Sequence, residues 1–170
     1  IPVAEFDQPA SVAEAVRLVR EFGRAVGESE RADALAAEIE RGTAPVAASV
    51  SRPRALVLHP NGYTVGRGSL VDDVLARAGL DNLGAALGSA GQVPLEAVVT
   101  SGADLLIVDD DDPGQPSLAT ALLRHPVLRA VRHRLHPVVI PSRLWTCAGP
   151  GLVEALTRLR AAAAALRKGA

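Results

Sequence analysis

The chain has 170 residues, 48% of them hydrophobic, which is enough for one core of about the usual domain size or one core with an appendage. Eighteen basic and nineteen acidic residues give a formal net charge of -1, which excludes a whole-molecule field that attracts nucleic acid or an anionic membrane. A single cysteine excludes an internal disulfide and metal-finger spacing, and no apolar run approaches the roughly 20 residues of a membrane span.

The first residues alternate in character, and the stretch IPVAEFD (1–7) predicts a strand that starts directly at Ile1. We interpret this start as a cut within a larger protein. Ser11 is then expected to cap a helix, with Glu14 as its capping-box partner, and Gly27 ends it. The apolar positions of this helix keep helical spacing: Val12, Val16, Val19, Phe22 and Val26.

A second helix is predicted from about Ser29, with an acidic first turn suited to the helix dipole. Its inward positions are Ala32, Leu35, Ala36 and Ile39. Gly42 and Pro45 weaken the pattern, so two outcomes stay open. The helix stops there, or it kinks and continues toward Val50.

From Pro53 onward, strands and helices are predicted to alternate. The short apolar run RALVLH (54–59) predicts a strand buried on both faces of a parallel sheet, and ADLLIVDD (103–110) predicts a second buried strand. A third strand is predicted at LHPVVIP (135–141). The stretches that predict helices are 68–80, opened by Ser69 and closed by Gly79, then 93–102, 117–131 and 149–168. This order predicts an α/β fold with a doubly wound, mostly parallel sheet, a Rossmann-like lobe with right-handed crossovers.

In such sheets ligands bind beyond the carboxyl ends of the strands. Three loops are predicted at that edge: HPNGYTVGRGS (59–69), DDDDPGQPS (109–117) and SRLWTCAGPG (142–151). The first has glycines at 62, 66 and 68 before a helix start, but their spacing is wrong for a dinucleotide fingerprint, and no P-loop lysine follows. The aspartate run 109–112 is a hard-cation site or, more in keeping with its spacing, a solvated loop that caps the next helix.

Cys147 has two interpretations. A helix beginning beyond Pro150 would lower its pKa and make it a nucleophile or thiolate ligand, and otherwise it is a small thiol that lines the loop. The candidate bases are His59, His125, His133 and His136, of which only His59 lies at a predicted strand end. The arginines at 124, 129, 132 and 134 are interpreted as a solvated helix surface.

Trp145, the only tryptophan, is either a plug over the sheet edge or a flat platform for a large ring-bearing or chelate ligand, with Tyr63 as a second surface. We expect it to be at least partly exposed. Arg67 and Arg143 are then placed to meet acidic groups of that ligand.

Several segments together resemble a known family: RADALAAEIE, RPRALVLHPNGYTVGRGSLVDDVLARAGLDNLGA, VPLEAVVTSGADLLIVDD and SRLWTCAGPGLVEALTRL. They look like the second half of the periplasmic substrate-binding proteins of ABC importers. The branch is the one whose two lobes are joined by a single long helix and which carries ferric siderophores, haem or cobalamin. The likeness spans nearly the whole chain.

The resemblance implies three parts. Residues 1–28 would be a remnant of the amino-terminal lobe, 29–50 the connecting helix, and 51–170 the carboxyl-terminal lobe. Most of the amino-terminal lobe, the other wall of the cleft, would lie outside this chain. The cleft in such proteins is lined at positions that correspond here to Tyr63, Thr64, Arg67, Gly68, Arg143 and Trp145.

The resemblance also implies a function: capture of an iron complex or a related metal-organic ligand for import, without chemistry, resident cofactor or bound metal. The expected partners are the ligand, an inner-membrane permease and the other lobe, and the expected place is the periplasm or an extracytoplasmic lipoprotein. Alternatives are a cobalamin-binding import protein, a doubly wound enzyme that uses Cys147, and an interaction domain with no small ligand. An unpaired strand at 1–7 is expected to pack against a second copy, exchange between chains or be disordered.

Overall fold

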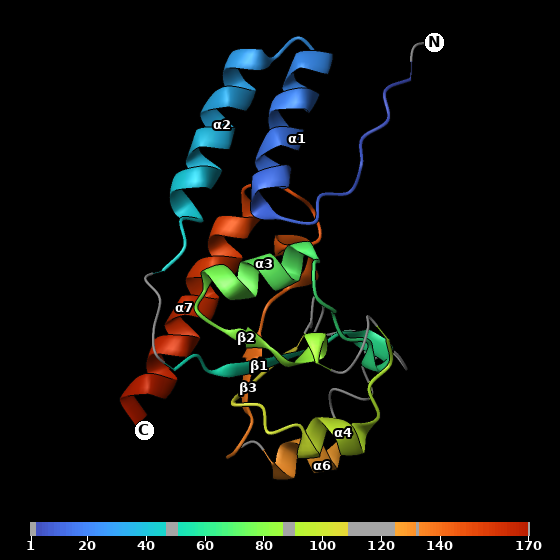
Figure 1. Cartoon of the computed structure of the whole chain (residues 1–170), viewed down its shortest axis with the longest axis vertical. Helices are drawn as coiled ribbons and strands as arrows, with labels where there is room; N and C mark the ends of the chain where they lie inside the picture. Colours follow the sequence, from blue (N-terminus) through green and yellow to red (C-terminus); the bar gives the residue numbers. More distant parts are fainter. Residues whose placement is uncertain (1–2, 47–50, 87–90, 109–124, 132, 170) are drawn as a thin grey trace.

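A parallel sheet of four strands forms the centre of the computed structural model, which describes residues 3–46, 51–86, 91–108, 125–131 and 133–169 (Figure 1). The strands are β1 (Arg54–Leu58), β2 (Asp81–Asn82), β3 (Leu105–Val108) and β4 (His136–Val139), in the order β2-β1-β3-β4. All neighbouring pairs are parallel. The predicted doubly wound α/β fold is confirmed. The strand β2 was not predicted, because its two residues are polar and form no apolar run.

The two central strands are buried on both faces. Ala55 pairs with Leu105 and Leu58 with Val108, so the register is continuous along β1 and β3. Successive side chains of a strand point to opposite faces. Alternate residues of β1 therefore belong to two cores: Ala55 and Val57 to one, and Leu56 and Leu58 to the other.

Helices cover each face of the sheet. On one side lie α3 (Leu70–Arg77) and the long α7 (Gly151–Gly169), and on the other lie the short α4 (Leu95–Thr100) and α6 (Pro126–Ala130) (Figure 1). The predicted cap of α3 is confirmed, because the Ser69 hydroxyl accepts the Asp72 N–H at 3.1 Å. Within the part of the chain that is described, no helix is both long and apolar enough to cross a membrane.

Two further helices, α1 (Val12–Ala25) and α2 (Ser29–Gly42), pack against each other and stand beyond the α/β layers (Figure 1). Ser11 caps α1 as predicted, with its hydroxyl accepting the Glu14 N–H at 3.2 Å. The Glu14 carboxylate reaches back to the N–H of Ala10 at 2.8 Å, one residue before the cap. We call α1 and α2 together the helical hairpin.

The second helix stops at Gly42, which decides between the two outcomes that the sequence leaves open. Thr43 closes it, since its N–H and its hydroxyl both donate to the Ile39 carbonyl, at 2.9 and 2.6 Å. Residues 44–46 are not helical, and 47–50 lie outside the described residues. A continuous helix over 29–50 is therefore not what the chain forms.

The predicted strand at residues 1–7 is wrong for its described part, because residues 3–9 have no regular structure. A strand needs a neighbour for its backbone hydrogen bonds, and alternating character alone does not supply one. The segment instead runs beside α1, with the Phe6 ring 5.9 Å from the Phe22 ring between centroids.

Across the helical hairpin, the Arg20 guanidinium binds the Glu40 carboxylate through two hydrogen bonds of 3.1 and 3.2 Å. These bonds hold the pKa of Glu40 below its ordinary value and raise the pKa of Arg20. Because Glu40 loses its proton more readily when folded, the contribution is present above the ordinary glutamate pKa and is lost as the pH falls through the folded pKa.

We therefore expect Glu40→Gln to lower the thermal midpoint at neutral pH by a small amount, as for an exposed ion pair. The difference from the parent should shrink as the pH is lowered. Melting curves of the parent, Glu40→Gln and the exposed control Glu38→Gln over an acid-to-neutral series measure this. A midpoint difference that grows on acidification would contradict the assignment.

Candidate functional site

The carboxyl ends of β1, β3 and β4 lie at one edge of the sheet because all the strands are parallel. Two of the three predicted loops at this edge are described, 59–69 after β1 and 142–151 after β4. The aspartate run 109–112 and the rest of the loop after β3 lie outside the described residues.

The first half of the loop after β1 is a tight turn. Asn61 and Gly62 both adopt left-handed backbone conformations, with φ of 61° and 78°. The His59 N–H donates to the Tyr63 carbonyl at 2.7 Å, and the Val93 N–H donates to the Gly62 carbonyl at 2.8 Å. The turn is thus fixed from both sides and leaves the Tyr63 side chain 49% exposed.

The second half of the loop is held by two polar side chains, Asp72 at the start of α3 and Asn82 in β2. The Asp72 carboxylate accepts the Gly68 N–H and the Asn82 amide N–H, both at 2.9 Å. The same Asn82 amide group donates to the Val65 carbonyl at 3.2 Å. Arg67 and Gly68 are exposed, and these hydrogen bonds anchor the backbone of their loop at Val65 and Gly68.

Thr64 lies between these anchored parts, but its side chain points inward. It is only 4% exposed, and its hydroxyl oxygen has no hydrogen-bond partner in the structure. The hydroxyl lies beside Gly84, where an added Cβ would come within 2.7 Å of it. Of the predicted site residues in this loop, three are exposed and Thr64 is beneath them.

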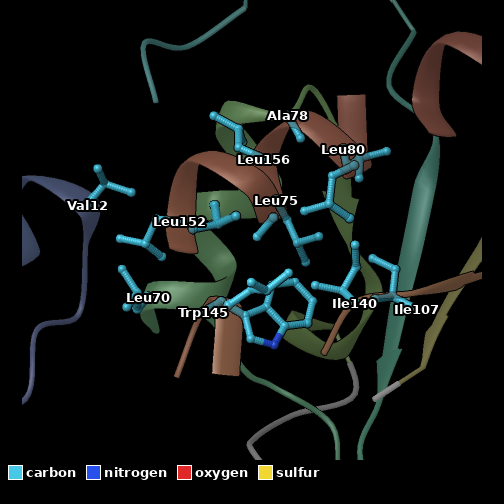
Figure 2. Close-up of a cluster of buried hydrophobic side chains, with 14 of the residues drawn as sticks. Val12, Leu70, Leu75, Ala78, Leu80, Ile107, Ile140, Trp145, Leu152 and Leu156 are labelled. Carbon is cyan, nitrogen blue, oxygen red and sulfur yellow. The ribbon is translucent and has the colours of Figure 1, made fainter. Parts of the chain in front are cut away.

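The prediction that Trp145 is at least partly exposed is wrong, because its side chain is 1% exposed. Figure 2 shows the indole among Leu70, Leu75 and Ile140, in the core between the sheet, α3 and α7. Burying so large an apolar surface outweighs the cost of the indole N–H, which has no partner in the structure. This burial agrees with the plug over the sheet edge, one of the two interpretations of Trp145.

The turn that follows Trp145 is shaped by close packing. An added Cβ at Gly151 would lie 2.9 Å from the Leu144 carbonyl oxygen, so only glycine allows α7 to begin this close to the loop. Leu144 is buried with Trp145, whereas Arg143 beside it is exposed. The loop thus carries one arginine outward over a buried leucine and tryptophan.

The remaining chemical candidates are spread over the fold. Cys147 is exposed in the loop before α7. The His125 ring caps α6, and the His136 ring contacts the Asp104 carbonyl at the amino end of β4, away from the candidate edge. Within the described residues, no group of three or more His, Cys, Asp and Glu side chains is placed to hold a metal ion.

A groove of about 660 Å³ lies along the helical hairpin. Its walls are mainly apolar and include Phe22, Val26 and Leu35, and its end reaches Ala148 and Gly149 of the loop after β4. None of the predicted site residues lines it. We call it the hairpin groove.

The residues that sequence reasoning missed are Asp72 and Asn82, which hold the loop after β1. Both lie within stretches quoted for the family resemblance, but nothing in their spacing shows that they contact each other. The available signal was an aspartate in the first turn of a helix opened by Ser69, which is usually a cap or dipole partner.

The fold and its edge loops define a class: a doubly wound α/β protein with exposed tyrosine and arginine side chains at the carboxyl edge of the sheet. Residues 1–135 match the family described as periplasmic binding protein. The chain belongs to this family. A comparison with curated proteins gave no match.

Solved structures of similar fold cover most of this chain. They include the periplasmic heme-binding protein RhuT from Roseiflexus sp. RS-1, at 24% identity over 92% of the chain with a TM-score of 0.68. An ABC-type Fe3+-hydroxamate transport system protein from Saccharomonospora viridis is 26% identical over 91%, with a TM-score of 0.72. The periplasmic vitamin B12 binding protein BtuF of Vibrio cholerae is 12% identical over 96%, with a TM-score of 0.70. The chain spans 65%, 59% and 66% of these three structures, respectively.

Because Trp145 is a core residue, we expect Trp145→Ala to lower the free energy of unfolding by about 3 to 5 kcal/mol, the usual cost of emptying a buried aromatic site. Tyr63→Ala, at an exposed position, should change it by less than about 0.5 kcal/mol. Chemical denaturation of both variants measures the difference. Equal, small effects at the two positions would show that Trp145 is not buried in solution.

Proposed function

We propose that this chain is part of the substrate-binding component of a bacterial ABC importer that captures an iron complex, either a ferric siderophore or haem, or a related metal-organic ligand. The observation that carries the proposal is the exposure of Tyr63, Arg67 and Arg143 at the carboxyl edge of the sheet in a member of the periplasmic binding protein family. The protein would act outside the cytoplasm and deliver its ligand to an inner-membrane permease.

The chemistry of these side chains suits such ligands. A tyrosine ring supplies a flat apolar face with a polar end for a ring-bearing ligand or a chelate. Two guanidinium groups supply planar donors for carboxylates or other acidic groups. Gly68 adds an exposed stretch of backbone with no side chain to restrict the approach of a bulky ligand.

Thr64 and Trp145, which were also predicted as ligand contacts, are assigned a supporting role in this proposal. The Trp145 side chain is buried in the core while Arg143 of the same loop is exposed, and the Thr64 side chain is buried while Tyr63 and Arg67 of its loop are exposed. Both would act by keeping the exposed side chains in place, which reduces the conformational entropy lost on binding.

The proposed division of the chain follows the resemblance. Residues 51–170 would form the carboxyl-terminal lobe, 29–50 the connection, with α2 as its helical part, and 1–28 the last part of the amino-terminal lobe. That lobe would supply the other wall of the cleft. The cleft would then close around the ligand by movement of the two lobes.

Cobalamin import is a second candidate, supported by the vitamin B12 binding protein among the structures of similar fold. Aromatic and arginine contacts suit this ligand as well, so the site chemistry does not separate the two. An enzyme that uses Cys147 has less support, because the thiol is exposed on a loop and His125 and His136 lie elsewhere.

The proposal is tested by titrating a longer protein that includes the preceding lobe with ferric hydroxamate, haemin and cobalamin. We expect tight binding of one of them. Tyr63→Ala, Arg67→Ala and Arg143→Ala should each weaken it by about 1 to 3 kcal/mol, the range for losing a central aromatic or arginine contact. The 170-residue chain alone, with one wall of the cleft, should bind in about the millimolar range.

Cys147→Ser serves as the matched control, because it alters an exposed side chain of the same loop as Arg143. We expect its affinity to equal that of the parent. Loss of binding by this variant with its fold intact would favour a thiolate site instead. Micromolar binding by the 170-residue chain would mean that one lobe is sufficient, and the two-lobe proposal would be abandoned.

A further inference from the structure

The helical hairpin is attached to the α/β layers at its base, where the chain enters α1 and leaves α2. At the entry, the Val12 N–H donates to the Asp73 carboxylate at 2.8 Å. At the exit, the Arg77 guanidinium donates to the Thr43 carbonyl at 3.1 Å, and the Val46 N–H donates to the Arg77 carbonyl at 3.2 Å. Both ends of the hairpin are thus bound to one helix, α3.

Asp73 and Arg77 are also bound to each other. The Arg77 Nε–H donates to Asp73 Oδ2 at 2.9 Å, the same oxygen that accepts from Val12. Their side chains are 28% and 23% exposed, so the pair is partly shielded from solvent. Charge-assisted hydrogen bonds at such a site are stronger and more directional than those of a fully exposed pair.

Apolar contacts at the base do not by themselves fix the direction of the hairpin. Val12, Ala15 and Ile39 belong to the core that α3 and α7 also line, and Gly42 lies so near Val153 that an added Cβ would come within 2.6 Å of it. The distal half stands free of the layers in Figure 1, and Phe22 there is 54% exposed. Apolar packing is non-directional, whereas hydrogen bonds at both ends of the helical hairpin define its angle to the α/β layers.

The same helix also holds the loop of the candidate site. Asp72, the residue before Asp73, accepts the Gly68 N–H and the Asn82 amide. Two consecutive carboxylates of α3 therefore bind in different directions, one to the loop that carries Arg67 and the other to the base of the hairpin. A rigid turn of helix connects these two contacts.

We propose that Asp73 and Arg77 are positioning residues that set the orientation of the helical hairpin relative to the loop 59–69. This rests on the proposed function, in which α1 belongs to the other lobe and α2 to the connection, so that the angle of the hairpin to the loop determines the width of the ligand cleft. The pair does not contact the ligand and acts through the backbone of Val12 and Thr43.

The experiment measures hairpin orientation directly, in the 170-residue chain and without ligand. Spin labels are placed at Arg24→Cys, at the far end of α1, and Glu96→Cys, on α4 beyond the sheet, in a Cys147→Ser background. Both label positions are exposed. Pulsed dipolar spectroscopy then gives the distribution of distances between the two labels.

With Asp73→Ala or Arg77→Ala we expect this distribution to broaden and shift, while the unsubstituted pair gives one narrow distance. Amide exchange at Val12 should also become faster by about tenfold in Asp73→Ala, as expected for the loss of one such hydrogen bond. Glu154→Ala is the matched control, because Glu154 and Arg158 form an ion pair of the same spacing on the exposed face of α7.

An unchanged distribution in both variants, or equal broadening in Glu154→Ala, would overturn the proposal. If Asp73→Ala does not fold, Asp73→Asn is measured instead, because it keeps the side-chain volume and removes the charge. An unchanged distance distribution, or equal broadening in Glu154→Ala, would again overturn the proposal. Because no ligand is added, an unchanged distance distribution would count against the role of Asp73 and Arg77 but not against the proposed function. A ligand titration without binding would count against the proposed function but would not alter the measured distances.

Discussion

The burial of both faces of the central strands β1 and β3 is the constraint on which the rest of this structure depends. Four consecutive residues of β1, Ala55 to Leu58, are inaccessible to solvent, so helices must cover the sheet on each side. Parallel strands joined by these helices leave their connecting loops at the two ends of the sheet. The carboxyl edge, where ligands of such sheets bind, carries the loops on which Tyr63, Arg67 and Arg143 lie.

Trp145 shows how the same constraint separates supporting residues from surface residues. Its indole completes the core beneath the loop after β4, and its neighbour Arg143 is directed outward as a consequence. Asp72 and Asn82 support the loop after β1 in the same way, but through hydrogen bonds instead of apolar packing. The exposed side chains of the candidate site are thus held from below by an apolar group on one side and by a polar pair on the other.

Most helices and strands could be predicted from the sequence, whereas contacts between residues far apart in the chain could not. Apolar runs such as Leu105–Val108 identify buried strands, and Ser11 and Ser69 identify helix starts, because these signals are local. Residues 1–7 have the alternation of a strand, but their described part, 3–7, pairs with no other strand, which no local pattern reveals. The burial of Trp145 depends on Leu70 and Leu75, far away in the chain, so a lone tryptophan in an edge loop was equally compatible with a ligand platform.

The central claim is that the ligand binds at the carboxyl edge of the sheet, on loops 59–69 and 142–151. Amide chemical-shift mapping of the 170-residue chain at millimolar ligand tests it most directly, with diamagnetic gallium hydroxamate, gallium protoporphyrin and cobalamin as probes. The account predicts that at least one probe shifts the amides around Tyr63, Arg67, Gly68 and Arg143 together. Shifts confined to the hairpin groove, around Phe22 and Leu35, would contradict it.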